Sequence, residues 1–167
     1  MPFTPYHEGP ALVIGLVFLR FIDLPTLLIS SIIVDLEPLT VILFGLPYPL
    51  HGFFHTFLGA TILGTVTFVV MLPLRKYFTP FMDAFGIHQE IKRSSIFLGA
   101  YIGVYKHILL DAPLYIEMNP FFPQMGNPFY GVVSSYAIYS LCTISFIIAV
   151  VIYILKVAVF RKDLPEI

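Results

Sequence analysis

Long uninterrupted runs of apolar residues constrain this chain more than any other feature of its sequence. The longest run extends from about Gly131 to Phe160, and another extends from about Phe53 to Leu74. Each is long enough to cross a bilayer as a helix, for which about 20 apolar residues suffice. Hydrophobic residues make up 58% of the chain and charged residues only 11%, whereas a soluble domain carries about 25% charged residues. The sequence therefore predicts an all-α, polytopic membrane helix bundle.

About five transmembrane helices are expected, and no repeat or linker divides residues 1–167, so the chain should form a single membrane-embedded domain. Asp23 is expected to cap the second helix, with Pro25 in its first turn. Glu37-Pro38 should disrupt that helix, with residues 39–44 continuing it as a second segment. The expected helices are about Gly9 to Ile22, Pro25 to Asp35 or beyond, Phe53 to Leu74, Ser94 to Leu110, and Gly131 to Phe160.

Basic residues predict how the bundle is oriented. Four of them flank the loop at 75–93 and three close the last helix, whereas the loops at 38–52 and 112–130 contain no Lys or Arg. The positive-inside rule then predicts a multi-pass protein of the cell membrane with its N-terminus outside and its C-terminus in the cytoplasm. The one cysteine, Cys142, lies in an apolar run and should serve packing rather than a disulfide.

That topology collects polar residues from four separate helix ends on the outer side of the membrane. The pair His51 and His55 and the pair His107 and Asp111 are each four residues apart, a spacing that places both members on one helical face. Asp35 and Glu37 would share a face only where the helix ends or kinks, which Pro38 favours. The potential ligands are His7, Asp35, Glu37, His51, His55, His107 and Asp111.

Histidines and carboxylates together suit zinc, manganese or iron. Taken singly, each residue has a plainer interpretation: His107 and Asp111 could be a hydrogen-bonded pair, and Asp35 could cap a helix or pair with Lys106. Their convergence favours a metal site, because ionisable groups at membrane depth usually mark function. Seven potential ligands exceed the four that one tetrahedral zinc needs. The site is therefore expected to hold one ion, or two ions that a carboxylate bridges. Two such ions would polarise a phosphoryl oxygen and generate hydroxide near neutral pH.

The outer loop "APLYIEMNPFFPQMGNPFYG", residues 112–131, follows the last of these ligands directly. We expect an ordered lid whose Glu117 and Asn119 contact the substrate, with a plain connecting loop as the alternative. Lys106 could steady a phosphate or a carboxylate. The apolar surroundings favour a lipid-like or small-molecule ester and membrane lipid as partners. Nucleic acid is not expected, because the outer face lacks a basic stripe. The sequence does not indicate an oligomeric state.

Four segments carry a resemblance to a known family: "TPYHEGPALVIG", "SSIIVDLEP", "HGFFHTFLG" and "YKHILLDAPLY", in this order. They resemble motifs of the membrane-bound metal-dependent hydrolases found in the inner membranes of archaea and bacteria. That family is distantly similar to the superfamily of zinc-dependent phospholipase C and fungal zinc nucleases, which are all-helical and cleave phosphodiesters at a metal cluster. The resemblance covers residues 4 to about 130. Unlike the soluble enzymes, this chain has no Trp and no His after Asp111, so fewer than three metals are expected.

The resemblance implies a role for each ligand. One metal would be held by Asp35, by His51 or His55, and by His107 and Asp111. Asp111 would bridge to a second metal that His7 also binds. Glu37 would be a further ligand or the general base that takes a proton from the attacking water, so that Glu37 and Asp35 are the expected catalytic carboxylates.

The sequence thus predicts a membrane-bound, metal-dependent hydrolase of the phosphoesterase type, with metal-activated water attacking an ester at the extracytoplasmic end of the bundle. A metal-ion transporter or channel is one alternative, but it would need ligands along a path to both faces. A metal-stabilised membrane protein without catalysis is another, and a closed shell of four ligands would favour it.

Overall fold

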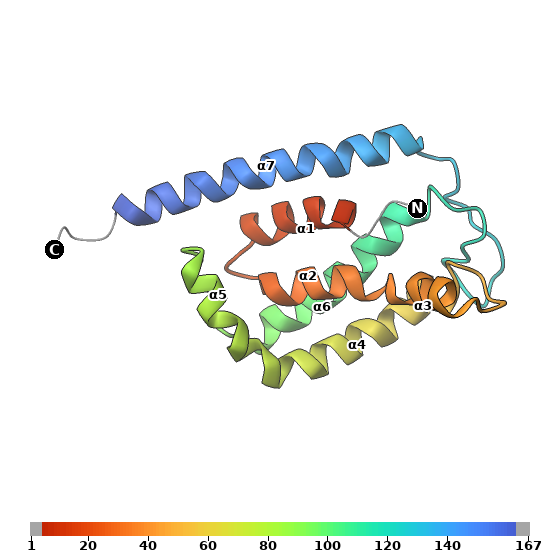
Figure 1. Cartoon of the computed structure of the whole chain (residues 1–167), viewed down its shortest axis with the longest axis horizontal. Helices are drawn as coiled ribbons and strands as arrows, with labels where there is room; N and C mark the ends of the chain where they lie inside the picture. The colour runs from red at the N-terminus through yellow and green to blue at the C-terminus, as the bar shows by residue number, and fades with distance from the viewer. Residues whose placement is uncertain (1–4, 163–167) are drawn as a thin grey trace.

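The chain folds into a bundle of helices (Figure 1), seen in a computed structural model that describes residues 5–162 and their side chains through residue 158. No β-strand occurs in residues 5–162, so the predicted all-α class is confirmed. The helices are α1 (Pro5–Val17), α2 (Leu24–Ile33), α3 (Leu36–Phe44), α4 (Phe57–Leu74), α5 (Thr79–Ala84), α6 (Arg93–Asp111) and α7 (Ser135–Lys162), with two 3-10 turns, η1 (Phe53–His55) and η2 (Arg75–Phe78).

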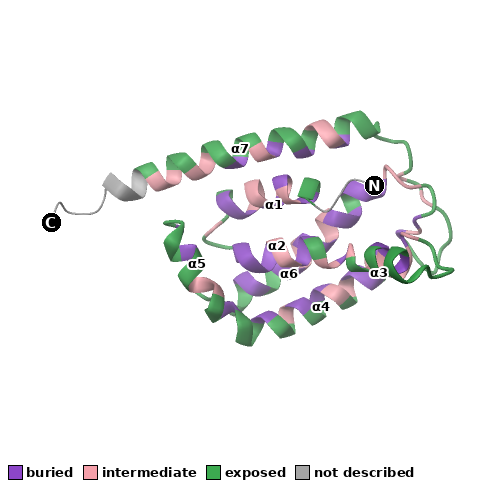
Figure 2. Cartoon of the chain, in the orientation of Figure 1, coloured by how far each residue is buried: buried purple, intermediate pink, exposed green. Residues whose placement is uncertain are grey.

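Three segments are long and apolar enough to cross a membrane: Leu24–Phe44, Phe57–Ala84 and Ser135–Ala158. Their outward faces are largely exposed along α4 and α7 (Figure 2), as expected for surfaces that meet lipid. Of the other two predicted spans, α1 has 13 residues and is about 20 Å long at about 1.5 Å per residue. Helix α6 carries Lys106, His107 and Asp111 within its last turns. Spanning by these two helices stays a prediction.

The break in the second predicted span lies slightly earlier than expected. Helix α2 ends at Ile33 and α3 begins at Leu36, so the chain breaks at Val34 and Asp35 rather than at Glu37-Pro38. Pro38 lies in the first turn of α3, where its missing N–H removes no helical hydrogen bond. Asp35 occupies the N-cap position of α3, but its side chain makes no capping hydrogen bond. The carboxylate is directed instead towards the histidines described below.

Helices α2 and α6 approach closely along a seam of small residues. On α6, Gly99 and Gly103 are four residues apart, and Ser30 of α2 donates a hydrogen bond to the Gly99 carbonyl at 2.9 Å. A Cβ atom at Gly103 would lie 1.8 Å from Ser30 Oγ and 2.7 Å from the Leu27 carbonyl oxygen. Such small-residue seams let helix backbones come close together in membranes. The seam continues by the same four-residue step to His107 and Asp111.

The close approach predicts an asymmetric effect of alanine at two helical glycines. Gly103→Ala should destabilise the protein by about 1–3 kcal/mol, because the added methyl overpacks a backbone contact. Gly64→Ala is the matched control, since its Cβ would meet only side chains, at 3.3 Å or more. This variant should not be destabilised in the same way, because alanine has a higher helix propensity than glycine by about 1 kcal/mol. Unfolding in detergent micelles measures both. Equal stability of the two variants would contradict the tight seam.

A buried polar cluster closes the other end of the α2–α6 seam. Asp23 caps α2 as predicted, accepting hydrogen bonds from the backbone N–H of Thr26 at 3.0 Å and from its hydroxyl at 2.5 Å. Arg75 is fully buried and donates from Nε to Asp23. Gln89 accepts from the Leu24 N–H and donates to the backbone carbonyls of residues 19 and 22. These contacts fasten the α5–α6 connection beneath α2.

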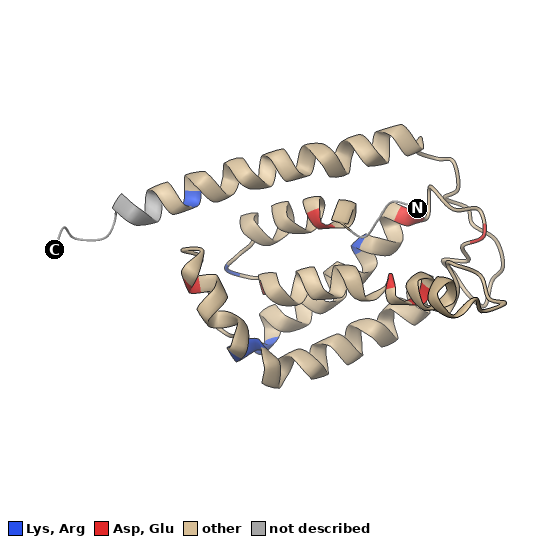
Figure 3. Cartoon of the chain, in the orientation of Figure 1, with Lys and Arg blue, Asp and Glu red and all other residues tan. Residues whose placement is uncertain are grey.

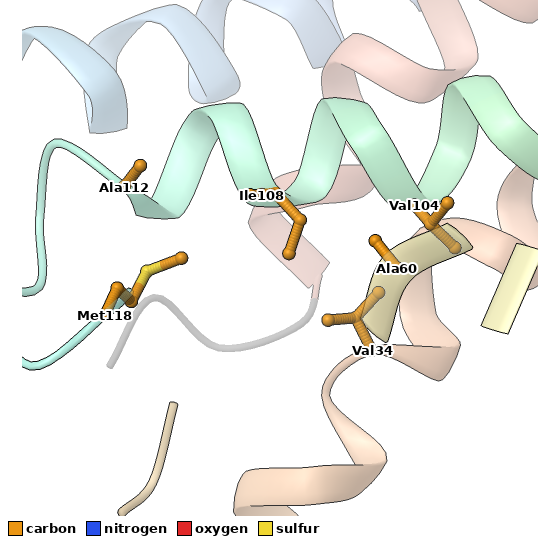
Figure 4. Packing of buried hydrophobic residues seen from close by; sticks show 6 residues of the cluster. All are labelled: Val34, Ala60, Val104, Ile108, Ala112 and Met118. Atoms are coloured by element: carbon orange, nitrogen blue, oxygen red, sulfur yellow. The ribbon is translucent and has the colours of Figure 1, made fainter. Parts of the chain in front are cut away.

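An apolar cluster lies beneath the opposite end of the bundle (Figure 4). It joins the end of α2, the start of α4, the end of α6 and the loop that follows α6. Four of its members immediately neighbour predicted site residues in the sequence: Val34 precedes Asp35, Ile108 follows His107, Ala112 follows Asp111 and Met118 follows Glu117. Its members are Val34, Ala60, Val104, Ile108, Ala112 and Met118. Packing of this cluster therefore fixes the backbone positions from which the polar side chains project.

Candidate metal centre

The last turn of α6 supplies two side chains to a buried polar cluster. His107 Nε2 lies 3.2 Å from Asp111 Oδ2, which confirms the predicted one-turn pairing on a helical face. The other ring nitrogen of His107, Nδ1, lies 2.7 Å from the Ser31 carbonyl oxygen. Because a carbonyl only accepts, Nδ1 carries a proton, and Nε2 presents a lone pair toward the carboxylates when the ring is neutral. His107 is fully buried and Asp111 almost so.

Asp35 and His55 complete the cluster from the α2–α3 break and from η1. Asp35 Oδ1 lies 3.4 Å from His107 Nε2 and 4.0 Å from His55 Nε2. His55 Nε2 lies 3.9 Å from Asp111 Oδ2. Figure 3 shows the acidic positions of α1, α3 and the end of α6 at one end of the bundle, and basic positions at the α4–α5 junction at the other.

The geometry fits a bound metal ion. One ligand atom from each of Asp35, His55, His107 and Asp111 lies within 4.8 Å of the other three. Ligand atoms about 2.0–2.1 Å from a tetrahedral zinc would be about 3.3 Å apart, close to the shorter distances here. The Nε2 atoms of His55 and His107 are buried without a hydrogen bond, which is costly unless another partner satisfies them. A divalent cation would satisfy both.

His7 approaches the same carboxylate from the other side. Its Nε2 lies 3.1 Å from Asp111 Oδ1, the oxygen that does not face His107. The ring stacks on His107 with centroids 4.2 Å apart, and neither of its nitrogens forms a hydrogen bond. Asp111 therefore directs Oδ2 toward His55 and His107 and Oδ1 toward His7. A carboxylate that bridges two metal ions requires this arrangement.

Lys106 holds the segment that carries His7. Its Nζ donates to the His7 carbonyl oxygen and to Ser31 Oγ, both at 2.5 Å. Lys106 thus ties the start of α1 to the part of α2 that orients His107. These contacts are those of a positioning residue, and its predicted contact with substrate stays a prediction.

Glu37 contacts His55 on the side of the ring away from the other ligands. Its Oε2 lies 2.8 Å from His55 Nδ1, and its two oxygens accept backbone N–H groups of Gly52 and Phe54 at 3.1 Å. The carboxylate therefore fixes the proton of His55 on Nδ1 and leaves Nε2 facing the cluster. The predicted role of Glu37 as general base stays a prediction, but these contacts orient a ligand.

The two glutamates that contact histidines allow a matched comparison. Glu37→Gln is expected to weaken metal binding by about 10–100-fold, the usual effect of removing a carboxylate that orients a ligand. Glu117→Gln removes a similar contact to His51, which lies outside the four-residue group, and should leave affinity nearly unchanged. Competition titration with a chelator measures both. Equal losses would contradict the orienting role of Glu37.

The two histidines of the segment "HGFFHTFLG" do not lie on α4. Helix α4 begins at Phe57, so His55 lies in η1 and His51 in the preceding turn; the prediction that both project from one helical face is wrong. Thr56, which follows His55, caps α4, because its hydroxyl oxygen accepts a hydrogen bond from the Gly59 N–H. The rings of His51 and His55 meet edge to face at 4.8 Å. Burial lowers the pKa of His51, whose Nδ1 lies 2.7 Å from Glu117 Oε1.

The loop after α6 packs against His51 and the start of α4. Met118 is fully buried in the apolar cluster, and the Pro120 carbonyl accepts from the Phe57 N–H at 2.9 Å. Asn127 donates to the carbonyls of Ala112 and Tyr115. Glu117 reaches His51 as described, whereas Asn119 makes its hydrogen bonds within the loop, accepting from the Gly126 N–H at 2.7 Å. The loop is therefore pinned beside His51 and the start of α4.

Three contributors were missed by the sequence analysis. The Ser31 carbonyl orients His107, and a backbone group leaves no signal in a sequence. Tyr115 stacks on His51 with centroids 3.7 Å apart, a contact between residues far apart in the chain that no local pattern indicates. Glu8 lies half-buried beside His7, with Oε1 buried and without a hydrogen bond. Its position next to a predicted ligand was the available signal.

The cluster has the donors to hold a divalent ion and to polarise a group bound to it. Two imidazoles and two carboxylates are ligands common to zinc, manganese and iron sites. His7 supplies a further donor on the far side of Asp111. Comparisons of this chain with protein-family models, with curated proteins and with solved structures found no match.

Proposed function

We propose that this protein is a membrane-embedded, metal-dependent hydrolase acting on an ester, with a phosphoester or lipid-like substrate. The observation that carries the proposal is the pair of buried imidazole Nε2 atoms, on His55 and His107, that face two carboxylates while their other ring nitrogens are held by Glu37 and Ser31. The motif resemblance to the membrane-bound metal-dependent hydrolases supports the same reading.

The chain's own residues would divide the work. Asp35, His55, His107 and Asp111 would hold zinc, with manganese or iron as alternatives, and His7 with the second oxygen of Asp111 would hold a second ion. Such ions supply Lewis acidity and lower the pKa of a bound water. Glu37 and Lys106 keep the ligands in place, and the pinned loop excludes bulk water. Asp35, less buried than the other ligands, is the carboxylate best placed to accept a proton from the attacking water.

The likeness of the four residues to a closed zinc shell supports a second candidate, a structural metal in a non-catalytic membrane protein. Four protein ligands complete a tetrahedral zinc, whereas catalytic zinc keeps a position open. His7 is the feature that distinguishes the two. A purely structural site has no need of a fifth buried donor 3.1 Å from a ligand carboxylate.

Transport is less favoured by the distribution of donors. The ligand atoms gather at one end of the bundle. Among the residues that the structure describes, the remaining histidine is His88, whose side chain is 75% exposed and pairs with Asp83. A path through the membrane would need donors along its length. For the hydrolase we propose an orientation with this end outside the cell, as the basic loops indicate.

Cobalt substitution separates the hydrolase from the structural site. Co²⁺-loaded protein in detergent is titrated with azide and with inorganic phosphate while its visible absorption is recorded. The hydrolase proposal predicts a spectral change as the anion takes an open position, together with metal-dependent release of product from phosphoester or carboxylester substrates. A spectrum that neither anion alters would assign the metal a structural role and contradict the proposal.

A further inference from the structure

A second candidate binding site lies away from the metal centre, in an apolar groove between α1, α2, α5 and α7. Figure 1 shows α7 continuing past the end of α1 on the side where α5 lies. The groove beneath this part of α7 has a volume of about 580 Å³, within the range of about 300–1,000 Å³ typical of ligand sites. Its walls include Leu16, Leu28, Phe81, Ala149 and Tyr153.

The lining leaves nothing for water to bind. All side chains that form the groove are hydrocarbon or thioether except for Tyr153, whose hydroxyl donates to the Phe85 carbonyl oxygen at 2.9 Å. Water needs two to four polar partners to occupy a cavity stably. The same hydrogen bond joins α7 to the residue that follows α5.

Three of the four walls belong to segments apolar enough to span a membrane. Helix α2 lies in Leu24–Phe44, α5 in Phe57–Ala84 and α7 in Ser135–Ala158. In a bilayer such a groove borders hydrocarbon, so a lipid chain can enter it sideways. A flexible chain would restore the dispersion contacts that an empty groove forfeits.

Two cations lie close in the sequence to residues that form or support the groove. Lys156 follows Tyr153 by three residues on α7, the spacing of neighbours on one helical face. Arg20 follows Leu19, which packs against the apolar cluster that forms the groove floor. Neither Arg20 nor Lys156 forms an ion pair with a carboxylate that the structure describes. The nearby acids Asp83 and Glu90 pair with His88 and Lys92.

We propose that this groove binds one acyl chain of an anionic phospholipid, with its phosphate near Lys156 and Arg20. This site is independent of the metal centre and of the proposed hydrolysis. Cationic pockets beside membrane helices suit anionic headgroups, and each Lys or Arg contributes about 1 kcal/mol, or about fivefold in affinity.

Native mass spectrometry of the full chain in mild detergent, with added phosphatidylglycerol or phosphatidylcholine, tests the proposal. Wild type should retain one phosphatidylglycerol per chain. Ala149→Phe places a ring in the groove and should lower retention by about tenfold or more, since each excluded methylene group loses burial. Val151→Phe adds the same ring to the exposed face of α7, where Val151 is 51% exposed, and should retain lipid as wild type does.

The headgroup contact has its own variant. Lys156→Gln should bind phosphatidylglycerol about fivefold more weakly while leaving phosphatidylcholine unaffected. Equal retention by the two phenylalanine variants would overturn the groove as the site. Should Ala149→Phe fail to fold, as judged by its helical circular dichroism, the wild-type measurement decides alone: a wild-type chain that retains no phospholipid overturns the proposal. No preference for the anionic lipid would overturn the assigned class.

Discussion

Replacement of His107 or Asp111 with alanine is expected to abolish metal binding by the purified protein. Each change deletes a side chain that would contact the metal directly and leaves the facing donors buried without that partner. Metal affinity should therefore fall by more than about 100-fold, beyond the effect of losing an orienting contact. Elemental analysis after purification without chelator measures it. Wild type should hold one or two equivalents of zinc, manganese or iron.

The control for these variants is His88→Ala. His88 is exposed and pairs with Asp83 at 3.0 Å, so its loss should leave metal content at the wild-type level. Helical circular dichroism confirms that each variant is folded. Metal that stays bound in both His107→Ala and Asp111→Ala would place the ion elsewhere. Wild type without metal would leave the histidines as buried polar groups and remove the basis of the proposed hydrolysis.

Arg75→Met is expected to destabilise the protein by about 3–5 kcal/mol, because it leaves the Asp23 carboxylate buried opposite an apolar side chain. Arg75 and Asp23 are both fully buried, and Thr26 satisfies only part of the carboxylate. The free energy of unfolding in mixed micelles measures the loss. Metal affinity, measured in the folded variant, should change little, because the ion pair lies at the opposite end of the α2–α6 seam.

Two further variants test whether the unpaired Asp23 charge causes the loss of stability in Arg75→Met. Lys76→Met changes the neighbouring cation, which is exposed, and should alter stability by less than about 0.5 kcal/mol. The double variant Asp23→Asn, Arg75→Met removes both charges and should be more stable than Arg75→Met alone. A double variant that is as unstable as the sum of its parts would argue that packing, rather than an unpaired charge, explains the loss.

The all-helical class and the places of the long helices could be predicted because apolar runs mark them. The positions of α4, α6 and α7 follow their runs to within a few residues, and the Asp23 cap follows from local chemistry. The first helix was misplaced: α1 covers Pro5–Val17 rather than Gly9 to Ile22. Pro10 lies inside α1, where it removes one backbone hydrogen bond without ending the helix. Beyond Val17 the chain turns, and Gln89 donates to the carbonyls of residues 19 and 22, a long-range contact that no local pattern contains.

All four residues of the candidate metal site were among the residues predicted from the sequence, but their geometry was not. Spacing correctly paired His107 with Asp111, because α6 is a regular helix there. The same argument failed for His51 and His55, because Thr56 starts α4 after them and the backbone at 51–55 forms turns. The break at Asp35 let Asp35 and Glu37 reach opposite sides of one imidazole, which the two-residue spacing alone could not reveal.

The seam between α2 and α6 runs along both helices and ends at the candidate metal centre. Gly99, Gly103, His107 and Asp111 form one stripe at four-residue steps on α6, and Ser31 on the facing helix holds the His107 ring. Sliding α6 lengthwise against α2 would carry two ligands away from the others. In the predicted membrane orientation, bilayer thickness would act along this same direction, by tilting helices whose apolar length does not match it. Metal affinity measured in bilayers of different acyl length should therefore change when the register of these two helices changes.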